Sequence, residues 1–95
     1  MRTVKITVGS TPTLVVTAPV FQTDSRPRIV LQILGPNSIF VGGADVAASG
    51  VTQGWKLNIN GAANFANFGS GEAIWAVCSP GETSDVVVLL EGPFG

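Results

Sequence analysis

The side chains able to perform chemistry in this chain are few, and none belongs to a catalytic motif. The 95 residues include neither histidine nor tyrosine. Histidine is the side chain that most often serves as general base, proton shuttle or metal ligand, so these roles lack their usual residue. The single cysteine, Cys78, would act as a nucleophile only beside an activating base, and the chain has no imidazole to serve as one. We therefore expect Cys78 to be a small buried residue of a strand, and we expect the protein not to be an enzyme.

The six carboxylates are the remaining candidates for acid–base or metal chemistry. They are Asp24, Asp45, Glu72, Glu82, Asp85 and Glu91. Any two of them would supply the pair that glycoside hydrolysis requires, but turn and strand-end positions explain most of them. The chain also lacks the D-x-D-x-D-G run of a calcium loop, and Gly69-Ser70-Gly71 has no following lysine or long helix to bind phosphate. The sequence thus predicts no metal and no cofactor.

Aromatic side chains offer one binding chemistry. Trp55, Phe65 and Phe68 are candidates for a platform on which sugar rings stack. The competing interpretation is that these rings belong to the core or to a subunit interface. Trp55 favours it, because this residue alternates with Leu57 and Ile59 on one face of an expected strand.

Charge and hydropathy exclude two classes of partner. Binding to nucleic acid requires clustered cations, whereas the chain has five Lys and Arg in total and a net charge of −1. A membrane-spanning helix requires about 20 apolar residues, and the longest aliphatic run, Val86 to Leu90, is far shorter. We therefore expect neither a nucleic acid nor a membrane as a partner.

Alternating apolar and polar residues, punctuated by glycine and proline, predict about seven short strands and no long helix. The expected strands are 2–8, 13–17, 28–34, 39–41, 55–60, 73–78 and 85–91. This pattern predicts a single all-β domain over residues 1–95, with 92–95 as a short C-terminal tail. A small β-sandwich or a jelly-roll-like β-barrel fits it equally well.

Two segments between the expected strands have more specific predictions. Gly35-Pro36-Asn37-Ser38 has the composition of a tight turn, so the strands on either side of it should form a hairpin. The repeated triplet over residues 63–68 places Phe65 and Phe68 three apart, which favours a short 3₁₀ turn at one end of the core.

Three of the expected strands are apolar on both faces, and only 12% of all residues are charged against a typical ~25%. Something must then cover the second apolar face of each strand. One possibility is a closed homo-oligomer, most simply a trimer, and the other is a cover by the chain's own residues 43–53. The candidate oligomer interface consists of Val30, Leu34, Ile74, Val87 and Leu89.

Several of these segments resemble a known family. The run 39–46 (IFVGGADV) is followed by Gly50, by 72–77 (EAIWAV) and by 86–91 (VVVLLE). Together they resemble small tailed-bacteriophage virion proteins, over roughly residues 28–91. In those proteins a strand ends in a Gly-Gly-x-Asp-Val-like loop, and a short turn leads into a valine-rich final strand. The resemblance implies a β-sandwich decoration (cement) protein on the outside of an icosahedral head, or a module of a head or tail fibre.

This resemblance also implies partners and a location. A decoration protein is made in the host cytoplasm, lies on the capsid exterior of the virion, and contacts the major capsid protein lattice and further copies of itself. The candidate capsid contacts, in the N-terminal strand and the tail, are Arg2, Thr3, Lys5 and Phe94. The family's final strand has alternating charged positions, whereas Val87 and Leu89 are apolar, which favours burial against a neighbouring subunit. The alternative is a glycan- or host-binding module of a phage tail or head fibre.

Overall fold

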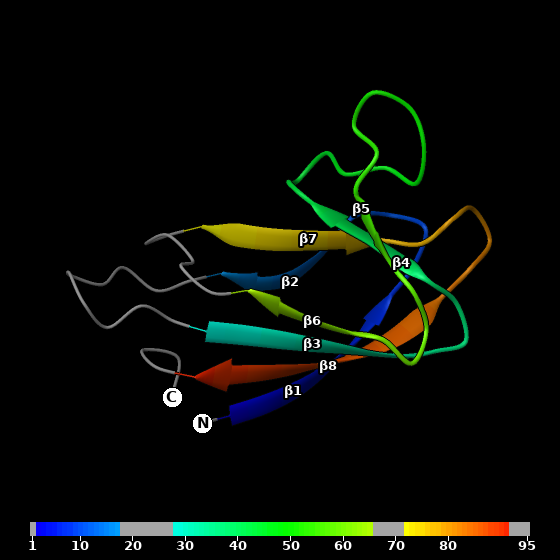
Figure 1. The fold of residues 1–95 in the computed structure, drawn as a ribbon. Coiled ribbons are helices and arrows are strands. Elements are labelled where there is room, and N and C mark those ends of the chain that lie inside the picture. The colour runs from blue at the N-terminus through cyan, green and yellow to red at the C-terminus, as the bar shows by residue number, and fades with distance from the viewer. Residues whose placement is uncertain (1, 18–27, 66–71, 92–95) are drawn as a thin grey trace.

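The computed structural model describes residues 2–17, 28–65 and 72–91, and this part of the chain is entirely strands, turns and loops (Figure 1). It contains eight strands, one more than the sequence indicates. They are β1 (Arg2–Val8), β2 (Thr13–Thr17), β3 (Arg28–Gly35), β4 (Ile39–Gly42), β5 (Trp55–Leu57), β6 (Ala62–Phe65), β7 (Ala73–Val77) and β8 (Ser84–Glu91). The all-β prediction is confirmed.

The strands form two four-stranded antiparallel sheets. Sheet A has the order β1-β8-β3-β6 and sheet B the order β2-β7-β4-β5. Four of the pairings, β1 with β8, β2 with β7, β3 with β6 and β4 with β5, are those of one long hairpin folded back on itself. Rolling that hairpin up adds the pairings of β3 with β8 and of β4 with β7. The sandwich therefore has the strand order of a jelly roll.

The core lies between the sheets and follows the period-2 pattern of the sequence. Ile29, Leu31 and Ile33 of β3 are fully buried, and so are Val86 and Val88 of β8. Each of these side chains packs in one continuous cluster, and truncation of a residue such as Leu31 to alanine would cost about 2–5 kcal/mol of folding free energy.

The predicted hairpin between β3 and β4 is wrong. Both edges of β3 are occupied, by β8 on one side and by β6 on the other. Beyond β6, the Asn60 amide donates to the Ile33 carbonyl (2.8 Å) and the Ile33 amide donates to the Gly61 carbonyl (3.1 Å). With no edge of β3 left to pair, the turn over residues 35–38 instead leads the chain into sheet B.

The predicted 3₁₀ turn is also wrong for the residues that the structure describes. Ala62–Phe65 is strand β6, which pairs with β3 and places Phe65 opposite Ile29 in the register. The edge of β3 that β8 leaves unpaired gains backbone hydrogen bonds from this segment. That pairing decides its conformation against the local preference for a 3₁₀ turn. Phe68 lies outside the described residues.

The outward side of sheet B is covered over β4 and β7 by the chain itself, through the β4–β5 loop (residues 43–54). Val46 of this loop is buried against Phe40 of β4 and Val77 of β7, with Trp75 packed beside them. Backbone hydrogen bonds within the loop hold it in place, for example from the Gly54 amide to the Ala47 carbonyl (2.9 Å). Over β4 and β7, the cover by residues 43–53 that the sequence left open beside an oligomer is confirmed.

Candidate functional site

The outward side of sheet A is the largest difference between the two sheets, and we call it the outer face of sheet A. It consists of Thr3, Lys5 and Thr7 from β1, Asp85, Val87 and Leu89 from β8, and Val30, Gln32 and Leu34 from β3. The register aligns these residues in rows across β1, β8 and β3, which lie side by side in Figure 1. One row is Thr3-Leu89-Val30 and the next is Lys5-Val87-Gln32.

The centre of this face is apolar and its β1 side is polar. Val30, Val87 and Leu89 are half-buried, and Leu34 is 47% exposed. None of these side chains belongs to either cluster of buried residues. In the described ranges, neither hydrophobic cluster has a loop residue on this face, whereas Val46 of the β4–β5 loop packs on sheet B.

The charged groups on the outer face of sheet A neutralise each other. Lys5 Nζ lies 3.6 Å from Asp85 Oδ2, and the Thr7 hydroxyl donates a hydrogen bond to Asp85 Oδ1 (2.9 Å). The ion pair is largely exposed, so it contributes little to the free energy of unfolding. An apolar centre bordered by polar groups without net charge is the composition of a protein–protein contact.

The structure brings together four of the five candidate interface residues. Val30, Leu34, Val87 and Leu89 share the outer face of sheet A. Ile74 was wrongly assigned to this set, because it lies inside the core with 6% of its surface exposed. Ile74 and Ala76 point inward from β7, whereas Trp75 and Val77 of that strand pack with the β4–β5 loop.

The candidate capsid contacts are not separate from this surface. Thr3 and Lys5 lie on the outer face of sheet A, in the same rows as its apolar residues. Arg2 is the first residue of β1, and Phe94 lies outside the described residues. One face therefore combines residues that the sequence assigned to two different contacts.

The candidate sugar platform is not assembled by the described residues. Trp55 is in sheet B and Phe65 is in sheet A, while Phe68 lies outside the described residues. A core position for Trp55 is wrong, because 78% of this residue is exposed. The reason is that β5 is a three-residue edge strand, which buries only Leu57 partly against the core.

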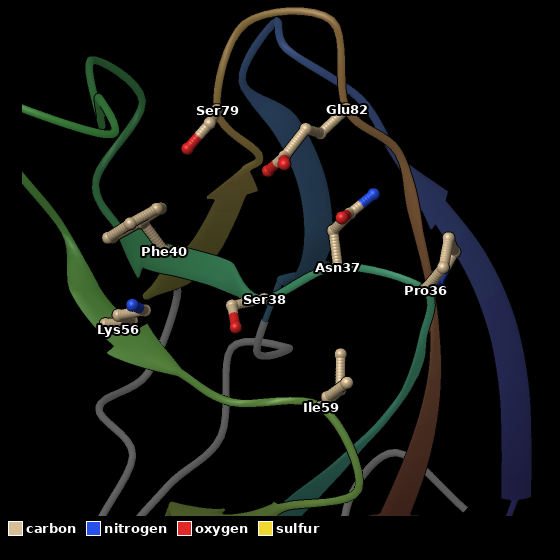
Figure 2. Close-up of a pocket in the computed structure, with 8 residues that line it drawn as sticks. All are labelled: Pro36, Asn37, Ser38, Phe40, Lys56, Ile59, Ser79 and Glu82. Carbon is tan, nitrogen blue, oxygen red and sulfur yellow. The ribbon is translucent and has the colours of Figure 1, made fainter.

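A pocket that the sequence did not predict lies beside the β3–β4 turn, β5 and the β7–β8 turn (Figure 2). Its volume is about 340 Å³. The lining residues are Pro36, Asn37, Ser38, Phe40, Lys56, Ile59, Ser79 and Glu82. These residues come from three separate stretches of sequence, so no local motif could have indicated the pocket.

The two turns beside this pocket are linked by a hydrogen bond. The Asn37 side-chain amide donates to the Thr83 carbonyl (2.9 Å), which joins the β3–β4 turn to the β7–β8 turn. The second turn is closed by a bond from the Glu82 amide to the Ser79 carbonyl (3.0 Å), with Gly81 at a φ of 79° that glycine adopts readily. The polar groups of the pocket are thus held on ordered backbone.

Cys78 is buried, as the sequence predicts, with 1% of its surface exposed. Its thiol lies 3.5 Å from the Val8 carbonyl, to which it donates. Burial, and then the negative charge of Glu82, raise the pKa of the Cys78 thiol above its ordinary value. The thiol therefore stays protonated and is a poor nucleophile at neutral pH.

Among the described residues, no three His, Cys, Asp or Glu side chains gather as they would around a metal ion. The same part of the chain has no helix long and apolar enough to cross a membrane. No protein-family model, no curated protein and no solved structure matches this chain.

Proposed function

We propose that this chain is a structural protein of a tailed-bacteriophage virion, which binds the outside of an assembled icosahedral head and stabilises it as a homo-oligomer. The observation that supports assembly is the outer face of sheet A, whose apolar centre no described part of the same chain covers. The assignment to a bacteriophage head is supported by the sequence resemblance over residues 28–91. A jelly roll is compatible with this role, since viral capsid proteins use that fold, but lectins use it too.

The size of the outer face sets the strength of the proposed self-association. Seven register pairs along β1 and β8 at ~3.4 Å each, and the three strands of this face at ~4.8 Å each, give a face of roughly 340 Å². A stable interface buries about 800 Å² per partner. If half of the area buried by two such faces is apolar, it contributes about 9 kcal/mol, against an association cost of about 4–15 kcal/mol.

The balance leaves at most a few kcal/mol in favour of association, so free subunits should associate only at high protein concentration. Copies that a lattice already holds close together have much of the association cost removed, and their contacts then add to one another. Binding to the assembled shell, and not to unfolded or loose coat protein, stabilises the shell by mass action. A closed trimer is the simplest arrangement for this purpose.

A subunit that uses the outer face of sheet A for its neighbours needs a second surface for the shell. The β4–β5 loop supplies one, because Val51 near the tip of the loop is fully exposed. The exposed Trp55 directly follows the last residue of the loop. Figure 1 shows the loop extending beyond the sheets. Since its base is fixed by the buried Val46, the loop is ordered before it meets a partner, which lowers the cost of binding.

Co-sedimentation with purified heads of the phage that encodes the chain tests this proposal. The wild-type protein should pellet with heads in a saturable manner and raise the temperature at which they release DNA. Val87→Asp, on the outer face, and Val51→Asp, on the loop, should each weaken binding, whereas Thr17→Asp adds the same charge on an exposed position of β2 and should not. If the wild-type protein stays in the supernatant, the proposal is wrong.

A further inference from the structure

The pocket of Figure 2 has the dimensions of a ligand site. Its volume of about 340 Å³ lies within the range of roughly 300–1,000 Å³ that small-molecule sites occupy. The Phe40 wall is anchored, because this ring is buried against Val46 and Val77. The opposite side is held by the hydrogen bond from Asn37 to the Thr83 carbonyl. The hollow is therefore a feature of the ordered fold.

The hydrogen-bonding groups around the pocket include both donors and acceptors. The amide nitrogen of Asn37 is used on the Thr83 carbonyl, so its oxygen, which Figure 2 shows on the pocket side, remains as an acceptor. The Ser38 hydroxyl lies 3.5 Å from the Asn58 side-chain oxygen, which is the outer limit of a hydrogen bond. This weak contact leaves the Ser38 hydroxyl available to a ligand. Ser79 adds a second hydroxyl.

Two opposite charges complete the lining and indicate the charge of the ligand. Figure 2 shows Lys56 and Glu82 on different sides of the hollow, and in the described part of the chain neither forms an ion pair. Phosphate or carboxylate groups would be attracted by Lys56 but repelled by Glu82. Cations would be attracted by Glu82 but repelled by Lys56. A neutral ligand with several hydroxyl groups satisfies both, because it donates to the carboxylate and accepts from the ammonium.

Apolar surface lines the remaining sides. Ile59 is 44% exposed and lies near Pro36, which is also exposed, and Figure 2 shows Phe40 on the other side of the hollow from Pro36. Sugar rings have this dual character, with C–H faces that pack on apolar groups and hydroxyl edges that form hydrogen bonds. We propose that this pocket binds a neutral saccharide of one or two rings, through Asn37, Ser38, Lys56, Ser79 and Glu82. This proposal does not depend on the proposed role in a virion.

Amide NMR titration of the full chain tests the proposal. The neutral probes are methyl glucoside, methyl galactoside, N-acetylglucosamine and their disaccharides, and the charged probes are sodium phosphate and sodium acetate. At least one neutral sugar should produce saturable shifts at the amides of Ser38, Lys56 and Ser79. Glu82→Gln and Lys56→Met should each weaken that sugar at least about tenfold, since each removes a charge-assisted hydrogen bond.

The matched controls change the same charges elsewhere. Asp85→Asn and Lys5→Met remove a carboxylate and an ammonium from the outer face of sheet A and should leave sugar affinity unchanged. The proposal is overturned if no neutral sugar shifts these amides, if only phosphate or acetate does, or if the pocket variants bind sugar as the controls do. Head binding is measured separately, so either proposal can fail without the other.

Discussion

Ser84 carries a buried hydroxyl group without a hydrogen-bond partner among the described residues. The residue is 1% exposed. A buried hydroxyl without a partner keeps its desolvation cost, so Ser84→Ala should raise the free energy of unfolding by about 1 kcal/mol. Urea denaturation measures this change, with the exposed Ser49→Ala as a control that should have almost no effect. A clear loss of stability in Ser84→Ala would contradict the burial of an unpaired hydroxyl.

The thiol of Cys78 links stability to pH. Because burial raises its pKa in the folded state, the folded protein holds this proton more tightly than the unfolded chain does. The resulting stabilisation is complete below the ordinary thiol pKa of about 8.5 and is lost as pH rises through the raised value.

The free energy of unfolding of the wild-type protein should therefore fall between pH 8 and 10 more steeply than that of Cys78→Ala. Native Cys78 should also react with a thiol reagent only as fast as the protein opens. Fast labelling of the folded protein at neutral pH, or equal slopes for both proteins, would show that the thiol is accessible.

At the scale of elements, the β4–β5 loop depends on Gly54. A methyl group at this position would lie 2.5 Å from Val46 Cγ2 and 2.7 Å from the Val41 carbonyl oxygen. Gly54→Ala should therefore displace the loop from sheet B and lower the free energy of unfolding by roughly 1–3 kcal/mol in urea. Gly9→Ala is the matched control, because a methyl group there meets nothing within 4 Å. Equal stability of the two variants would mean that the loop does not pack as described.

The same scale shows how much of the fold the sequence could predict. Alternation located β1, β3 and β8 almost to the residue, because one buried face fixes the period of a strand. It could not decide that β4 leaves sheet A or that Ala62–Phe65 becomes a strand, since both depend on which edge of β3 is still free. Ile74 shows the same limit, because a strand that is apolar on both sides does not indicate which side faces the core.

The candidate sites divide in the same way. Val30, Leu34, Val87 and Leu89 could be grouped from the sequence because they occupy alternate positions of two strands that pair directly. The pocket could not, because residues as distant as Asn37 and Glu82 meet only when the two turns come together.

For the whole molecule, the two sheets differ in how their outward sides are covered. The β4–β5 loop covers sheet B over β4 and β7, whereas the outer face of sheet A has an apolar centre, a polar β1 side, and no loop residue in a hydrophobic cluster with it. The low charge of the chain agrees with this asymmetry, since a protein that exposes all of its surface generally carries more charged groups. The central claim is therefore that copies of this chain meet through the outer face of sheet A.

Sedimentation equilibrium over a wide range of concentration tests this claim most directly. It compares the wild-type protein with Val87→Asp and with Thr17→Asp, after circular dichroism has shown that all three are folded. We predict that the average mass of the wild-type protein and of Thr17→Asp rises above the monomer with concentration, while Val87→Asp remains a monomer because association would bury an unpaired carboxylate. A wild-type protein that stays monomeric throughout, or a Val87→Asp variant that associates equally well, would contradict the account.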